Sequence, residues 1–461
     1  VPELVDDRQY LRRLYMDLLG MLPSPDVVEA YAADGKKGKQ ERLVDNVLAD
    51  NQSFAEHWMT FWNDALRNDY KGTGYIDGGR KQISNWLYRS LYTNKPHDKF
   101  VRELISPRGP SEGFINGIKW RGSETANQQI ELQAARSVSQ VFLGVNMKCA
   151  SCHDSFVNQW KLADAYGLAN AFSEKPMALY RCDVATGDMA KTEFLWPELG
   201  EIDAEASLEE RRKQVGALVT SPENGWFSRT IVNRLWKSMM GRGLVEPLDS
   251  MDAEPWNADL LDMLAAAFVE QEYDVRAMLK LIATSKAYQL ASDVRTPSKG
   301  TYTFVGPIPR RLTVEQFYDA MGCVTGVWQA KAEMNPKEDA GSISEGTIRA
   351  WRATAGPMMR ALGRPNREQI MLARETDYTR LHALELTNGN TLAAYLTKSS
   401  EALLNEGPIK TAALFARALG RPLTAGEGVL IDTYGATLGS PEDVQDVLWL
   451  LFNHPEFQLV F

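Results

Sequence analysis

Apolar residues recur at intervals of three and four along most of the chain, the spacing of one buried helix face. The segment from Asp7 to Gly20 shows this pattern, with apolar residues at Tyr10, Leu11, Leu14, Leu18 and Leu19. The ranges 54–69 and 225–243 repeat it. The strict alternation of apolar and polar residues that marks a half-buried strand is nearly absent. We therefore expect a mainly α fold with long irregular loops and few short strands.

Capping residues support the helical interpretation. Ser24 is followed by Pro25, which fits the first position of a helix because that position needs no backbone donor. Thr313 with Gln316, and Thr424 with Glu427, have the spacing of a capping box. These residues predict where several helices begin.

A chain of 461 residues is too long for one hydrophobic core, so at least two domains are expected. The helical pattern is interrupted between residues 174 and 215, where prolines and the acidic stretch ELGEIDAEASLEE occur. We predict an N-terminal helical domain over residues 1–173, an inter-domain segment over 174–215 and a C-terminal helical domain over 216–461.

Net charge argues against a nucleic-acid partner, and hydropathy argues against a membrane-spanning segment. The net charge is −9, whereas a nucleic-acid-binding protein needs a basic face to neutralise phosphates. No apolar run approaches the roughly 18 residues that a membrane-spanning helix requires. We expect neither a nucleic-acid partner nor a transmembrane segment.

The densest cluster of rare residues is Cys149-Ala150-Ser151-Cys152-His153. The chain has only four cysteines and five histidines. Cys-x-x-Cys-His is the attachment signal for haem c, because two thiols at a helix start reach the two vinyl groups of one porphyrin and the histidine ligates its iron. The motif therefore predicts a covalent haem c held by Cys149 and Cys152, with His153 as an iron ligand.

Two further kinds of cysteine site fit the sequence less well. A dithiol redox site normally accompanies a βαβ unit, which the pattern does not predict. A zinc site needs a second ligand pair at short spacing, and Cys182 is the only cysteine nearby in the sequence. Cys182 and Cys323 either form a disulfide or lie buried as small apolar residues.

The second axial ligand of the iron is not determined by the motif. His57, in the aromatic segment AEHWMTFW, is the first candidate, since histidine is a common haem ligand. Met177 and Met189 are alternatives, and an open sixth position is a further one. A histidine or methionine on an apolar helix face is more often part of the core.

Several motifs together give the chain a family resemblance. They include RRLYMDLLGMLPSPDVVEAY, KCASCHDSF, TIVNRLWKSMMGRGLVEPLD, LIATSKAYQL and DVLWLLFNHPEF. In this order they resemble the paired domains of unknown function in planctomycete-type cytochrome-like proteins, over nearly the whole chain. The resemblance implies an exported protein, periplasmic or at the cell surface, found near polysaccharide-degrading enzymes.

The haem motif suggests an oxidoreductase, whereas the resemblance supplies no established reaction. We expect a dehydrogenase that oxidises a carbohydrate and passes electrons to an external acceptor such as a cytochrome. Such chemistry needs a base and groups that fix hydroxyls, for which Asp77 and Arg80 in the glycine-rich segment 63–80, and His382, are the catalytic candidates. The alternatives are a mono-haem electron carrier and a haem-free carbohydrate-binding scaffold.

Overall fold

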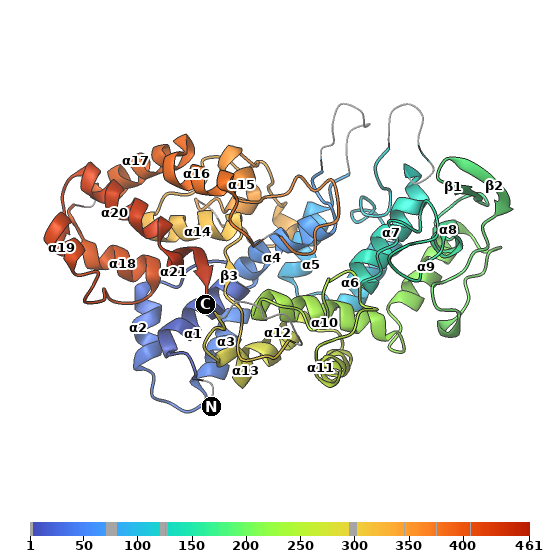
Figure 1. Ribbon diagram of the computed structural model, residues 1–461, viewed down its shortest axis with the longest axis horizontal. Coiled ribbons are helices and arrows are strands. Elements are labelled where there is room, and N and C mark those ends of the chain that lie inside the picture. Colours follow the sequence, from blue (N-terminus) through green and yellow to red (C-terminus); the bar gives the residue numbers. More distant parts are fainter. Residues whose placement is uncertain are drawn as a thin grey trace.

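The computed structural model describes residues 3–70, 81–119, 125, 128–294, 302–344, 346–374, 376–405 and 407–461. Helices dominate these ranges and the strands are short, so the predicted mainly α class is confirmed. The helices form an elongated arrangement, with α14 and the later helices at one end and α7, α8 and α9 at the other (Figure 1).

The larger hydrophobic core is built by the helices of the first two thirds of the chain. Its buried residues run from Tyr10 to Tyr288, with a few contributions from residues 334–351. The helices are α1 (Asp7–Leu18), α2 (Pro25–Ala33), α3 (Lys39–Leu48), α4 (Asn51–Ala65), α5 (Ser84–Tyr92), α6 (His97–Ile105), α7 (Ile130–Leu143), α8 (Leu162–Asn170), α9 (Leu208–Val219), α10 (Gly225–Met240), α11 (Ala258–Glu270), α12 (Val275–Thr284) and α13 (Lys286–Gln289).

A second core is formed by the remaining helices together with Met16 and Leu22 from the N-terminal region. These helices are α14 (Val314–Thr325), α15 (Pro357–Ala361), α16 (Arg380–Asn388), α17 (Asn390–Leu404), α18 (Thr411–Leu419), α19 (Val429–Tyr434), α20 (Pro441–Asn453) and α21 (Pro455–Gln458). The capping box of Thr313 and Gln316 is present at the start of α14. Hydrophobic packing thus changes from one core to the other between about residues 288 and 312.

The first core continues through the segment 174–215. Met177, Phe194 and Ile202 are buried in it, as are Val215 and Val219 on α9. This segment also contains an antiparallel hairpin, β1 (Ala178–Arg181) paired with β2 (Val184–Met189). The other strand pairs in the described ranges are β3 (Arg310–Arg311) with β6 (Leu459–Val460) and β4 (Ile409–Lys410) with β5 (Thr437–Leu438).

Helix α1 binds the C-terminal residues of the chain through two arginines. Arg13 donates from Nε to the carbonyl oxygen of Phe461 at 2.6 Å, and Arg12 donates to the carbonyl of Glu456 at 2.6 Å. Arg13 is almost fully buried, so these backbone carbonyls replace the water that its guanidinium loses. The C-terminal strand β6 is thereby held against the N-terminal helix.

Helix α4 lies between the two cores and carries buried carboxylates toward the second. Arg349 donates to Asp319 on α14 at 2.7 Å and lies 3.7 Å from Glu56 on α4. Arg374 donates from Nε to Asp64 on α4 at 2.8 Å and from Nη2 to Glu315 on α14 at 3.0 Å. Two arginines therefore bridge α4 to α14.

Replacing Arg349 with alanine tests this bridge. The change leaves Glu56 and Asp319 buried without their cation, and breaking a buried ion pair in this way costs about 3–5 kcal/mol. We expect the free energy of unfolding, measured by urea denaturation, to fall by that amount. The control is Lys191→Ala, which removes an exposed partner of Glu193 and should change it by less than about 0.5 kcal/mol. Equal effects of the two variants would contradict a structural role for the bridge.

Candidate functional site

The cysteine–histidine motif lies on one hydrogen-bonded turn just after α7. Gly144 ends α7 with φ +62°, where an added Cβ would lie 2.2 Å from Met251 Cγ. The backbone N–H of His153 then donates to the carbonyl of Cys149 at 3.1 Å. The turn does not continue into a helix, since α8 begins only at Leu162. The expected helix before the motif is present, but the motif does not start one.

A carboxylate from the second half of the chain fixes this turn. Asp249 Oδ2 accepts from Gln140 Nε2 at 2.9 Å and from Asn146 Nδ2 at 2.8 Å. Asn158 Nδ2 donates to the carbonyl of Asn146 at 3.0 Å. The end of α7 and both flanks of the motif are therefore held in one hydrogen-bond network.

The hydrogen bond of His153 defines its tautomer. Nδ1 lies 2.7 Å from the carbonyl oxygen of Asp154, and because a carbonyl only accepts, Nδ1 carries the proton. In the neutral imidazole the lone pair is then on Nε2, for which the described residues provide no hydrogen-bond partner. Metal-ligating histidines have this arrangement, in which the second nitrogen donates to a carbonyl and orients the ring.

Exposed apolar residues surround the motif. Phe156 is 87% exposed, Val157 80% and Val184 72%, while Cys149 and Cys152 are half-buried. The ring of Phe156 lies 4.7 Å from that of His153. Large exposed apolar side chains in one place typically mark a surface that a ligand or partner covers.

A third cysteine adjoins the motif. The backbone N–H of Cys182, in the turn between β1 and β2, donates to the carbonyl of Cys152 at 2.7 Å. Cys323 lies on α14 in the second core, where burial raises the pKa of its thiol to about 11. All four cysteines are free, so Cys182 and Cys323 do not pair.

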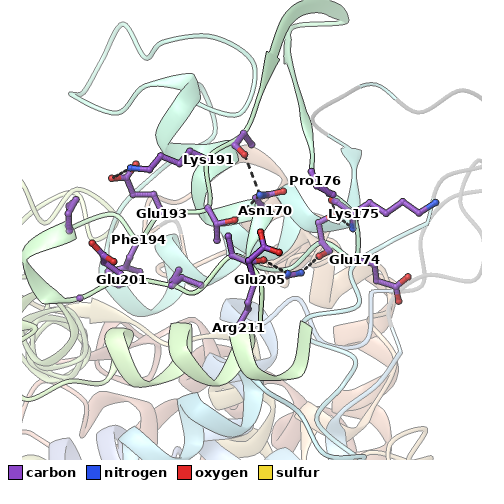
Figure 2. A pocket seen from close by; sticks show the side chains of 17 residues that line it. Asn170, Glu174, Lys175, Pro176, Lys191, Glu193, Phe194, Glu201, Glu205 and Arg211 are labelled. Atoms are coloured by element: carbon purple, nitrogen blue, oxygen red, sulfur yellow. Dashed lines mark hydrogen bonds and ion pairs between the residues drawn. The ribbon is translucent and has the colours of Figure 1, made fainter. Parts of the chain in front are cut away.

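The base of the hairpin borders the depression in Figure 2, which has a volume of about 650 Å³. Asn170 on α8 donates to Thr192 at 2.8 Å and accepts from the backbone N–H of Met177 at 2.9 Å. Arg211 on α9 donates to the carbonyls of Ser173 and Ala206. These polar side chains of the depression therefore brace the hairpin, whose turn carries Cys182.

Two half-buried arginines lie near the motif. Desolvation lowers the pKa of Arg67 to about 10, and Arg136 lowers it further by repulsion, while Glu368 opposes both effects. Desolvation also lowers the pKa of Arg136, against the opposing influence of Cys152. Within the described part of the chain neither guanidinium forms an ion pair.

The structure does not bring His57 to the motif. On α4, its Nε2 lies 3.1 Å from the carbonyl oxygen of Asp17, and its Nδ1 faces Gly20, where an added Cβ would lie 2.3 Å away. Burial, with a further contribution from Arg349, lowers the pKa of His57 to about 3. Its ring is neutral, contacts α1 and borders a cavity between the two cores.

Of the other candidate residues, His382 lies in the second core, the two methionines lie at the hairpin that adjoins the motif, and two residues lie outside the described ranges. His382 on α16 is buried and accepts from Arg311 at 2.9 Å, and its pKa is lowered to about 4 by burial. Met177 is buried at the base of the hairpin, while Met189 is exposed on β2. Asp77 and Arg80 lie outside the described residues.

Comparison with known families defines the class of this protein. The family PSCyt2, described as a protein of unknown function (DUF1549), matches residues 1–176, and PSD1, a protein of unknown function (DUF1553), matches residues 211–434. The chain belongs to the proteins that carry these paired domains, as the resemblance of its motifs predicts. No curated protein and no solved structure matches it. None of the helices in the described ranges is long and apolar enough to cross a membrane.

The neutral state of His57 predicts a pH dependence of stability. An imidazole in the unfolded chain titrates near pH 6.5, but the folded-state pKa is about 3, so the unfolded state binds more protons between these values. The contribution of His57 is complete above about pH 6.5 and decreases by about 1.4 kcal/mol per pH unit as the pH falls toward 3.

We therefore expect the stability difference between the wild type and His57→Gln to shrink between pH 7 and pH 5 in urea denaturation. The matched control is Met59→Leu on the same helix, whose effect should not depend on pH because no titrating group changes. A difference that stays constant for His57→Gln would show that the folded-state imidazole is accessible to protons.

Proposed function

We propose that this chain is a c-type haem protein, exported from the cytoplasm, that acts as an oxidoreductase. Cys149 and Cys152 would hold the porphyrin through thioether bonds, each formed by addition of a thiol S–H across a vinyl group. His153 would ligate the iron. When bound, the haem supplies one-electron redox chemistry.

The observation that carries this proposal is the orientation of His153. Its Nδ1–H is engaged by the Asp154 carbonyl, which leaves the Nε2 lone pair available on the same turn as both thiols. A zinc site fits less well, because the described residues contain no group of three or more metal-ligating side chains. The donor set is that of a haem attachment site.

The surroundings of the motif also suit a porphyrin. Its macrocycle is a flat apolar surface, and Phe156, Val157 and Val184 present apolar side chains beside the thiols. Its propionate groups are anionic, and Arg67 and Arg136 are half-buried cations that form no ion pair within the described residues. Pairing with propionates would relieve the cost of burying two like charges.

The reaction that we propose is oxidation of a carbohydrate, with electrons passed to an external acceptor such as a cytochrome. The exposure of Phe156 and Val157 supports an accessible edge at which an acceptor can approach. An electron carrier without a substrate is the second candidate, and the same exposed edge would serve it.

Haem attachment is tested by a covalent haem stain after denaturing electrophoresis of protein matured with a cytochrome c assembly system. We expect a stained band for the wild type and its loss in the Cys149→Ala, Cys152→Ala double variant. Cys182→Ala is the matched control, since this cysteine adjoins the motif but lies outside it, and its band should persist. An unstained wild type, or a stain that survives the double substitution, would refute attachment at the motif.

The enzyme and the electron carrier predict different responses of the bound haem to sugars and to carbon monoxide. For an enzyme we expect at least one sugar of a monosaccharide panel to reduce the ferric protein, as followed by the visible spectrum, and carbon monoxide to bind the ferrous form at an open sixth position. The control without sugar should stay oxidised. Absence of both reduction and carbon monoxide binding would identify a carrier with two strong axial ligands.

A further inference from the structure

A cavity of about 210 Å³ lies between the two cores, apart from the motif. Its walls come from α4, α10, β3 and the residues 371–374 and 376. Figure 1 shows α4, α10 and β3 meeting near the centre of the molecule. We call it the central cavity.

Cations outnumber anions in its wall. Among the described residues that line it are five cationic side chains, Arg234, Lys237, Arg310, Arg311 and Arg374, and two carboxylates, Asp17 and Asp64. Two of the cations pair with carboxylates outside the wall, Lys237 with Glu246 at 2.7 Å and Arg374 with Glu315 at 3.0 Å. Both carboxylates are already engaged. Asp17 accepts from Arg310 at 2.8 Å and from the hydroxyl of Tyr288 at 2.7 Å, and Asp64 accepts from Arg367 and Arg374.

Arg234 provides a buried charge that forms no ion pair within the described residues, although Asp249 acts on it from a distance and raises its pKa against the effect of burial. It is 3% exposed, and its two terminal nitrogens donate to the carbonyls of Val141 and Gln140 at the end of α7. Burial lowers its pKa to about 9, which leaves it cationic at neutral pH. No ion pair of Arg234 occurs in the part of the chain that the structure describes.

Three N–H donors of the wall also lack an acceptor. They are Nε1 of Trp58, Nε of Arg234 and Nε of Arg310. Trp58 is 4% exposed. A buried donor without a partner is unfavourable, and more so when it is charged. Such atoms in a native protein indicate an acceptor that the chain itself does not supply.

We propose that the central cavity binds a small ligand with an anionic oxygen group, either a free oxyanion or the acid group of a small sugar acid. Such a group accepts several hydrogen bonds at once and compensates the charge of Arg234, whereas a neutral ligand or water would satisfy the donors but not that charge. The volume is below the roughly 300 Å³ of ordinary ligand pockets, which limits the occupant to a small molecule. This binding does not depend on haem attachment.

The test is calorimetric titration of the full-length protein with glucuronate, glucose and inorganic sulfate. We expect glucuronate, sulfate or both to bind at least 10-fold more tightly than glucose. Competition between the two anions would indicate that they share the site, and binding of sulfate alone would identify a free oxyanion as the ligand. Absence of anion binding, or equal binding of glucose and glucuronate, would overturn the proposal.

A pair of tryptophan variants locates the site. Trp58→Phe removes one unpartnered indole N–H from the wall, and loss of a hydrogen bond to a charged group should weaken anion binding about 10-fold or more. Trp351→Phe is the matched control, because Trp351 also has a buried Nε1 without a partner but does not line the cavity. If both variants bind the anion like the wild type, the anion binds elsewhere and the proposal fails. Haem staining of both variants should be normal, so this result is independent of the haem proposal.

Discussion

The fold depends on the burial of charge at helix α4. Its aromatic residues Phe54, Trp58 and Trp62 belong to the first core, while Glu56 and Asp64 are buried toward the second. A buried carboxylate is unfavourable unless a cation and hydrogen bonds compensate for its lost hydration. Arg349 and Arg374, from the segment after α14, provide this compensation. The same ion pairs that join the cores therefore determine where the segment 349–374 lies, and with it one wall of the central cavity.

The motif is held in place by parts of the chain that are distant in sequence. Asp249 binds the end of α7 and the start of the motif, and the hairpin β1–β2 contributes Cys182 to the same place. The two matched families cover residues 1–176 and 211–434, so the second half of the chain supports the motif of the first.

Much of the fold can be predicted from the sequence because helices are determined by local interactions. Ser24 caps α2 with Pro25 following, and Thr313 and Gln316 form their capping box, as their types and spacing predict. The hairpin was not predicted, because the residues of β2 are all exposed and give no alternation of apolar and polar positions. The inter-domain segment of residues 174–215, predicted from prolines and acidic residues, contains this hairpin and buried core residues, and its role as a domain boundary stays a prediction.

The candidate site was predictable only in part, because only some of its features are determined by local sequence. The order of Cys149, Cys152 and His153 is local and indicates haem by itself. Other features of the site depend on long-range contacts that no spacing in the sequence encodes. These contacts place Cys182 beside Cys152, Arg67 near Arg136, and His57 against α1. Arg67 belongs to the polar segment 63–80, but its burial depends on packing.

The central claim is that Cys149 and Cys152 hold a haem with His153 as its ligand. Mass spectrometry of the mature protein and of its proteolytic peptides tests this claim most directly. The account predicts that the chain is heavier by one haem and that the added mass resides on the peptide with Cys149 and Cys152. An unmodified peptide, or one lighter by two hydrogens because its cysteines form a disulfide, would contradict it.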